Sequence, residues 1–189
     1  MTKRACLCTL SLAIASVAML TTSCTSSNSL RSSLSAAISS TPDRSSRSKP
    51  KPSSPESSIR YNQFALSQSN GSNTRLVIDV ADQRGYLLVN GKVAVDTPVS
   101  TARPGKSTPR GTFYMSQRVR QGKISTIYGV EMPYWMRLSS TVYGVHAGHL
   151  PGYPASAGCV RLPSSAAQVI FDNTRSGTRV NIYSSWDGA

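Results

Sequence analysis

Residues 141–162 read TVYGVHAGHLPGYPASAGCVRL and contain both histidines of the chain and the last of its four cysteines. The β-branched and aromatic residues that open this stretch predict a strand with His146 near its end. The following GHLPGYPASA is rich in Gly and Pro, which indicates a defined loop across a cleft before Cys159. Three interpretations are open at this point: a thiol active site, a metal site, or a glycine-rich loop without chemistry.

The sequence around this stretch has the pattern of a small β domain. Short strand-like runs follow one another as RLVIDVA, YLLVN, KVAVDTPVS, GTFYMSQR and YWMRL, and RVNIYSS closes the series. The Asn-Gly pair after YLLV predicts a tight hairpin. One helix is predicted at SSAAQVIFDN, with Ser164 or Ser165 as its N-cap. We therefore expect a mainly β domain with one short helix over residues 74–184 and a short tail over residues 185–189.

Residues 1–24 have the layout of a secretory signal. Two basic residues precede an uncharged apolar run to Leu20, which is too short for a membrane span, and small residues follow it. The ending LTTSC resembles a lipoprotein signal, in which Cys24 becomes the lipidated first residue of the mature chain. Thr21 stands where such signals usually carry Leu. We expect an exported protein of the cell envelope or periplasm that is attached to a membrane through a lipid on Cys24.

Residues 25–73 are dominated by Ser, with interspersed Pro and few large apolar residues. Such a segment buries too little apolar surface to offset its ordering entropy, so it predicts a disordered linker that gives the domain reach. The net charge of +13 is spread along the chain without a long basic run. This distribution and the export signal predict no nucleic-acid partner and favour an anionic envelope polymer or membrane surface.

The cysteine count leaves one thiol for chemistry in the mature domain. Two cysteines lie inside the signal and Cys24 is the expected lipidation site, so Cys159 has no partner for an intramolecular disulfide. A cysteine hydrolase or transferase needs a thiolate, a base and oxyanion donors, and this stretch supplies Cys159, His146 and the amides of Gly158 and Cys159. A metal site would use His146, His149 and Cys159, but the mature chain has no fourth Cys or His, which argues against structural zinc.

These residues carry a family resemblance. YGVHAG followed by PGYPASAGCVRLP resembles the signature of the L,D-transpeptidases of the YkuD type, which are bacterial cell-wall enzymes. That signature is a histidine, a loop, Ser/Thr-His-Gly-Cys, a hydrophobic residue and Arg or Asn. TPVSTARPGKSTPRGTF and MPYWMRL resemble further family segments, and the resemblance covers residues 75–183. It implies β-sandwich-like mixed sheets with one short helix.

The resemblance implies roles for individual residues. Cys159 matches the nucleophile and His146 the general base, which the family orients through a backbone carbonyl, here that of Ala147. The amides of Gly158 and Cys159 match the oxyanion side of the site. The matched residues that shape and support the turn are Ser156 and Arg161. The nearby histidine is also expected to bring the pKa of the Cys159 thiol below its free value of about 8.5.

The implied substrates are peptidoglycan stem peptides. The Cys159 thiolate would attack the carbonyl of the third residue of a tetrapeptide stem, release the terminal D-alanine and leave a thioester. Three acceptors could then react with the thioester. An amine of a second stem would form a cross-link between third residues, and a lysine of an envelope protein would attach that protein to the stem. Water would release a trimmed stem, which is the activity of an L,D-carboxypeptidase. No metal or organic cofactor is implied.

One residue departs from the family pattern. The chain has Ser156-Ala157-Gly158-Cys159 where the family usually has Ser-His-Gly-Cys, so the second motif histidine is absent. We hypothesise that His149, on the loop after His146, partly replaces it. The alternative is a catalytically impaired paralogue that serves as a peptidoglycan-binding module.

Overall fold

The computed structural model describes residues 54–188 of the chain. The expected signal peptide, the lipidation site Cys24 and the linker up to residue 53 lie outside the described residues. Among residues 54–188, no helix is both long enough and apolar enough to cross a membrane.

The expected linker does not extend to residue 73. The 3-10 helix η1 (Pro55–Ser58), strand β1 (Arg60–Tyr61) and helix α1 (Gln63–Ser67) precede the predicted domain. Asn62 caps α1, since its side chain accepts a hydrogen bond from the Ala65 amide at 3.1 Å. Ala65 and Leu66 of this helix pack with Val89 and Ala94 of the sheet. The few apolar residues within the polar sequence therefore suffice to dock it, which composition alone did not reveal.

The domain is built on a nine-stranded mixed sheet within the described residues. Its order is β1-β4-β3-β2-β9-β5-β6-β7-β8, with parallel pairing in β2/β9 and β7/β8 and antiparallel pairing elsewhere. The remaining strands are β2 (Thr74–Asp79), β3 (Arg84–Val89), β4 (Lys92–Pro98), β5 (Gly111–Val119), β6 (Trp135–Leu138), β7 (Gly144–Ala147), β8 (Val160–Leu162) and β9 (Arg179–Tyr183).

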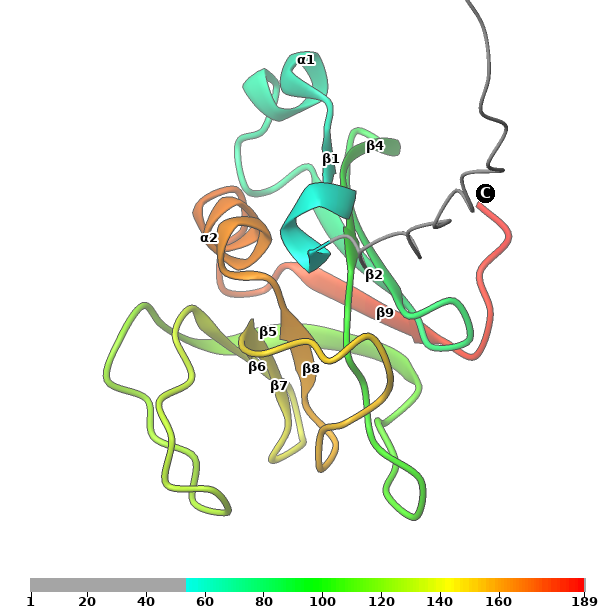
Figure 1. The fold of residues 1–189 in the computed structure, drawn as a ribbon. Helices are drawn as coiled ribbons and strands as arrows, with labels where there is room; N and C mark the ends of the chain where they lie inside the picture. The colour runs from blue at the N-terminus through cyan, green and yellow to red at the C-terminus, as the bar shows by residue number, and fades with distance from the viewer. Residues whose placement is uncertain (1–53, 189) are drawn as a thin grey trace, which may run out of the picture. The chain divides into compact units, whose positions relative to one another are not determined.

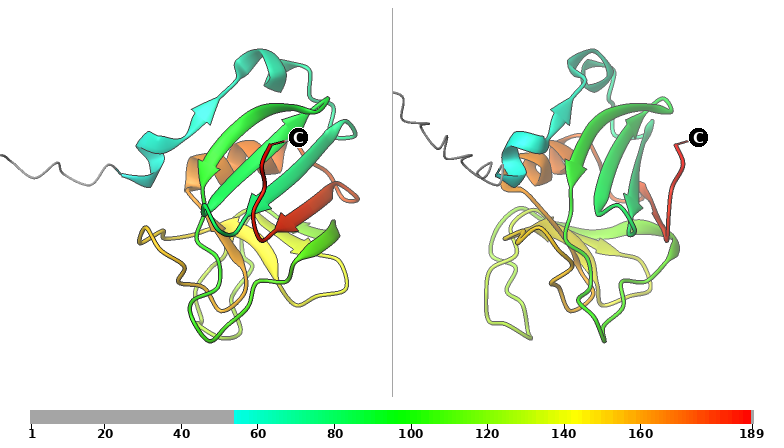
Figure 2. Two further views of the ribbon diagram at one scale, coloured as in Figure 1. Left: turned by 90° about the vertical axis from the view of Figure 1, so that its right-hand side faces the viewer. Right: turned by 45° about the vertical axis from the view of Figure 1, so that its right-hand side comes forward.

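Strand β5 joins two limbs of this sheet. Its residues up to Tyr114 pair with β9, and its residues from Met115 onward pair with β6, with a register shift between Met115 and Gln117. Such an irregularity bends the strand and increases its twist. The sheet therefore curls, with β2 and β9 in one limb and β6, β7 and β8 in the other (Figure 1 and Figure 2). This arrangement confirms the predicted mainly β, mixed-sheet class.

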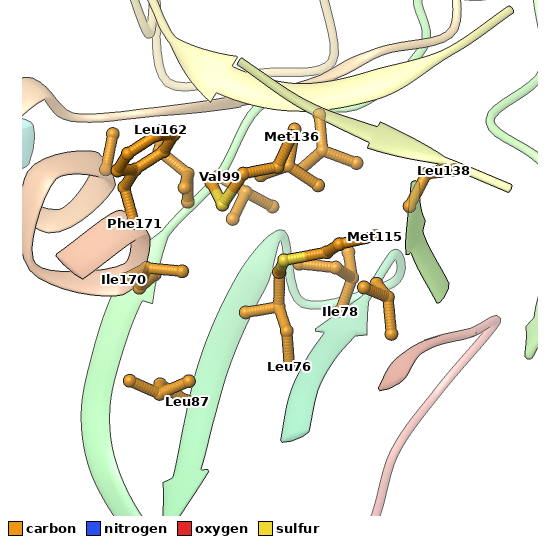
Figure 3. Close-up of a cluster of buried hydrophobic side chains, with 14 of the residues drawn as sticks. Leu76, Ile78, Leu87, Val99, Met115, Met136, Leu138, Leu162, Ile170 and Phe171 are labelled. Atoms are coloured by element: carbon orange, nitrogen blue, oxygen red, sulfur yellow. The ribbon is translucent and has the colours of Figure 1, made fainter. Parts of the chain in front are cut away.

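The hydrophobic core fills the space between the limbs. Both limbs contribute fully buried side chains, as shown by Leu76 and Ile78 from one and Met136 and Leu138 from the other (Figure 3). Helix α2 (Ser164–Asp172) contacts both β4 and β7. It buries Ile170 among these side chains. Burial of such a continuous apolar surface is the main favourable term in folding.

Two details differ from the sequence prediction. The N-cap of α2 is Pro163, whose carbonyl accepts the first intrahelical bond from Ala167 at 2.9 Å, rather than Ser164 or Ser165. The expected tail is packed, because the Trp186 amide donates to Asp79 Oδ2 at 2.8 Å and its ring lies 4.7 Å from that of Tyr86.

Candidate functional site

The site is built on one face of the parallel β7/β8 ladder. Its register pairs Val145 with Val160 and His146 with Arg161. Successive side chains of a strand point to opposite faces, so each strand has a core face and a second face. The core-facing side chains are Val145, Ala147, Val160 and Leu162, all of them buried. The other face carries Gly144, His146 and Arg161, together with Cys159, which immediately precedes β8.

His146 is held in one orientation by its own strand. The Nδ1–H group donates to the Ala147 carbonyl oxygen at 2.7 Å, which leaves Nε2 as an acceptor. The imidazole is only 7% exposed, and the ring of Trp135 lies with its centroid 6.0 Å away. Burial lowers the pKa of His146, and the charge of Arg161 lowers it further, while the hydrogen bond to Ala147 acts in the opposite direction. The resting histidine is therefore a neutral base.

Cys159 carries a free, partly buried thiol. Burial raises the pKa of this thiol, whereas a backbone hydrogen bond with Gly144 and the charge of Arg161 act to lower it. The expectation of a thiol pKa below the free value is wrong for this resting site, because burial outweighs both favourable interactions. Burial therefore favours the neutral form of both the thiol and the imidazole.

Gly144 makes room for the ring of Trp135, which lies beside His146. A Cβ atom at this position would lie 2.6 Å from the Trp135 ring and 2.8 Å from the Met136 carbonyl oxygen, which no side chain tolerates. Sequence reasoning did not single out Gly144 or Trp135. An isolated glycine inside a strand pattern often marks a position where another group packs closely against the backbone, and this signal could have identified Gly144.

The turn before Cys159 is closed by Ser156. Its hydroxyl accepts a hydrogen bond from the Gly158 amide at 3.0 Å and donates to the Cys159 carbonyl oxygen at 2.6 Å. The Gly158 amide is therefore occupied within the turn and is not free in this structure to act as one of the two oxyanion donors predicted from the sequence. Gly158 has φ +143°, and any Cβ there would overlap the ring of Tyr143, which packs on the turn.

The segment preceding the turn is also fixed. Ser100 is fully buried, and its hydroxyl donates to the Tyr153 carbonyl oxygen at 2.8 Å and accepts from the Ala155 amide at 3.1 Å. Backbone bonds in both directions join Ser100 to Arg161 at 3.0 Å. The VSTA segment directly after β4 therefore joins the loop to β8, which gives Cys159 a rigid support.

One cavity of about 740 Å³ contains this face of the ladder. His146, Cys159, Ser156 and Arg161 line it, and so do Ala157 and the exposed His149. The structure thus brings the predicted side chains to one site. Among residues 54–188, no three His, Cys, Asp or Glu side chains are grouped so that they can hold a metal ion.

A loop between β5 and β6, here called the 120–133 flap, forms one wall of the cavity. Its wall residues are Lys123, Ile124, Ser125, Thr126, Ile127, Tyr128, Val130, Glu131 and Met132. The Tyr128 hydroxyl accepts a hydrogen bond from Arg103 Nη1 at 2.8 Å, and the Arg161 guanidinium lies 6.0 Å from the Tyr128 ring centroid. Sequence reasoning assigned no role to this segment, although its several large apolar residues are unusual for a surface loop.

Comparisons with known proteins agree with this architecture. The model of the family described as YkuD, L,D-transpeptidase catalytic domain, matches residues 73–182. No curated protein matches the chain. Among solved structures, an L,D-transpeptidase from Stackebrandtia nassauensis has 22% sequence identity and a TM-score of 0.55, over 65% of this chain and 60% of that one. The chain thus spans 60% of the length of that relative.

Two further solved structures show the same fold. An L,D-transpeptidase from Xylanimonas cellulosilytica has 27% identity and a TM-score of 0.55, over 60% of this chain and 62% of that one. The L,D-transpeptidase LdtMt1, solved in complex with imipenem, has 20% identity and a TM-score of 0.56, over 59% of each chain.

Proposed function

Because the chain belongs to the YkuD family of L,D-transpeptidase catalytic domains, we propose that it is a peptidoglycan L,D-transpeptidase that acts through a thioester on Cys159. One observation carries the proposal. His146 lies on strand β7, Cys159 immediately precedes β8, the parallel neighbour of β7, and both residues line one cavity of about 740 Å³. This volume is in the range of pockets that enclose small ligands, and it can accept part of a stem peptide.

The first half of the reaction transfers the acyl group to the enzyme. His146 Nε2 takes the proton from the Cys159 thiol as the sulfur attacks the carbonyl carbon of the third stem residue. The Cys159 amide is the donor available to the oxyanion, because Ser156 occupies the Gly158 amide. The imidazolium then gives its proton to the amine of the terminal D-alanine, the amide bond breaks and a thioester remains.

The second half returns the thiol. A nucleophile that enters the cavity loses a proton to His146 and attacks the thioester carbonyl, and the Cys159 sulfur leaves and is reprotonated. An amine of a second stem gives a cross-link between third residues, a protein lysine gives attachment, and water gives a trimmed tripeptide. Charged side chains of both signs line the cavity, among them Lys123, Glu131 and Arg161, which suits a stem peptide that carries both amines and carboxylates.

Acylation by imipenem tests the proposed nucleophile. We expect intact-mass spectrometry to show one imipenem adduct on the wild-type chain, no adduct on Cys159→Ser, and slow formation on His146→Gln. Release of D-alanine from a disaccharide-tetrapeptide should follow the same order. An adduct that persists in Cys159→Ser, or no adduct on the wild type after prolonged exposure, would contradict the mechanism.

Ala157 favours a second candidate, a peptidoglycan-binding module with impaired chemistry. The side chain at this position lines the cavity but carries no group that can donate or accept a hydrogen bond. This candidate predicts that the wild type sediments with isolated sacculi while it neither forms the imipenem adduct nor releases D-alanine.

The proposal also covers where the protein is located and which acceptor resolves the thioester. We propose that the protein is exported and attached to a membrane through a lipid on Cys24, which would place the domain next to its polymer. Metabolic labelling with a fatty acid, lost in Cys24→Ala, tests the anchor. Muropeptide analysis of a deletion strain distinguishes cross-linking, trimming and protein attachment by the product that disappears.

A further inference from the structure

A second cavity, of about 470 Å³, lies apart from the Cys159 site and shares no lining residue with it. It is lined by the starts of β2 and β9, by part of β3 and β5, and by the turns around Gly71 and Gly177. Three of its side chains are arginines, Arg75, Arg175 and Arg179, and none is acidic. We call it the arginine cavity.

Two of these arginines are direct neighbours across the sheet. Arg75 of β2 pairs in register with Arg179 of β9, and Arg179 pairs in turn with Tyr114 of β5. Like charges opposite one another on adjacent strands are destabilising. Among residues 54–188, neither arginine forms an ion pair, since the salt bridges present join Arg84 to Asp96 and Arg120 to Asp172. Within this described part of the chain, the two like charges thus have no acidic ion-pair partner.

Arg175 adds a third positive charge from the turn above the strands. A Cβ atom placed on Gly71 would lie 3.7 Å from three carbon atoms of the Arg175 side chain, so its aliphatic part lies along the Gly71 backbone. The Arg175 amide also donates to Thr178 Oγ1 at 3.0 Å, which fixes the turn. Hydroxyl groups complete the polar wall, from Ser72, Ser176 and Thr178.

We propose that the arginine cavity binds a phosphate group carried by an anionic polymer. Guanidinium groups present planar, paired donors that match phosphate oxygens bidentately, and three of them here face one recess without a competing carboxylate. A bound phosphate would remove the repulsion between Arg75 and Arg179. The volume of the cavity leaves room for a substituent on each side of the phosphate, as in a polyol-phosphate chain.

A polymer fits this site better than a membrane surface. The phosphate must enter a recess, and Tyr114 is the one large apolar side chain exposed among the lining residues. Stable attachment to a bilayer usually needs a broader apolar surface or a lipid chain in addition to basic residues. That the polymer belongs to the cell envelope rests on the proposed function, whereas the phosphate site itself does not.

Binding of poly(glycerol phosphate) and inorganic phosphate to the full chain tests the inference. We expect saturable binding by calorimetry at constant ionic strength, with chloride as the reference anion, and a Kd at least about tenfold weaker in Arg75→Gln/Arg179→Gln. The matched control is Arg60→Gln/Arg110→Gln, which removes the same charge from exposed positions outside the cavity and should bind within about twofold of wild type. Phosphate should also raise the Tm of the wild type and of the control, but not of the cavity variant.

Several results would overturn the inference. Among the variants, these results are equal weakening of phosphate binding in the two double variants, or unchanged phosphate binding in the cavity variant. Among the ligands, they are equally tight binding of a carboxylate polymer, or binding to phosphatidylglycerol vesicles without binding to the soluble polymer. Circular dichroism verifies that the cavity variant is folded. Because no lining residue is shared, Cys159→Ser should bind phosphate normally and the cavity variant should still form the imipenem adduct, so failure of one proposal is distinguishable from failure of the other.

Discussion

His146 and Cys159 have pKa values displaced in opposite directions by the same physical cause. Burial disfavours the charged form of each, so it lowers the pKa of the imidazole and raises that of the thiol. Both shifts favour the neutral thiol and the neutral imidazole over a charged pair. In the proposed mechanism, proton transfer then accompanies attack on the substrate, so that His146 would act as a general base in the transition state.

The rate of imipenem acylation should therefore depend on neutral His146. The ordinary pKa of histidine is about 6.5, and burial places that of His146 lower, so we expect a plateau near neutral pH and a decline only in acid below that value. A second rise is expected above the ordinary thiol pKa, where free thiolate appears. Stopped-flow absorbance across pH measures this profile, and His146→Gln should lose the acidic limb. A rate that stays constant into strong acid would instead indicate a resting ion pair.

The lowered pKa of His146 also makes the free energy of unfolding depend on pH. Because the pKa of His146 is lower in the folded state, the unfolded chain binds the proton first as pH falls below about 6.5. The contribution of His146 to the free energy of unfolding is thus present above this pH and is lost on acidification. Urea unfolding of wild type and His146→Gln should show a smaller acid dependence in the variant.

Ala157→His tests whether the missing imidazole limits turnover. The side chain at this position lines the cavity beside Cys159, so the variant should raise D-alanine release about tenfold or more if a hydrogen-bonding group there stabilises the transition state. His149→Ala provides the matched comparison. If His149 partly compensates, its removal should slow the wild type but not the Ala157→His variant, and the two changes should be non-additive. Equal slowing in both backgrounds would show that His149 does not substitute for the missing imidazole, and no slowing in either would assign His149 no part in the reaction.

At the scale of elements, Tyr128 is one of the side chains that join the 120–133 flap to the rest of the domain. Its hydroxyl accepts a hydrogen bond from Arg103 and its ring faces the guanidinium of Arg161, which lines the cavity. Tyr128→Phe removes only the hydrogen bond, and we expect KM to rise by about two- to tenfold with little change in kcat.

The exposed Tyr153 supplies a matched control, since Tyr153→Phe makes the same chemical change outside this contact. Steady-state release of D-alanine should be unchanged in that variant. A fall in kcat with constant KM in Tyr128→Phe would show that Tyr128 acts in the chemical step rather than in holding the flap.

The elements that were predictable from the sequence are longer and show a local pattern, whereas the missed elements are short and depend on contacts with residues far away in the sequence. Runs such as RLVIDVA and the pattern around His146 carry local periodicity, so their strands were predictable. Strand β8 spans only Val160–Leu162 and exists because it pairs with β7, and helix α1 is stable because Ala65 packs on the sheet. The site residues followed from motif types, but the occupied Gly158 amide and the thiol pKa depend on hydrogen bonds and burial that only the fold shows.

At the scale of the whole domain, the segment after β9 contributes to stability. The Trp186 ring packs on Tyr86 and its amide bonds to Asp79, which joins the tail to β2 and β3. Trp186→Ala should lower the free energy of unfolding by about 1–2 kcal/mol. Urea denaturation measures this change, with Ser185→Ala as a near-neutral neighbour. Imipenem acylation of the folded protein should not change, and a large loss of acylation would show that the tail also shapes the distant cavity.

The position of β9 in the sheet has a consequence for how the domain forms. This strand is the last in sequence among residues 54–188, yet it lies in the middle of the sheet, between β2 and β5. Its parallel partner β2 is separated from it by about a hundred residues, so the pairing of β2 with β9 closes a long loop at a large cost in chain entropy. The two limbs cannot be joined until the end of the domain has left the ribosome. We therefore expect a chain that lacks β9 to leave its two limbs unjoined, because β9 is the strand that pairs with both β2 and β5.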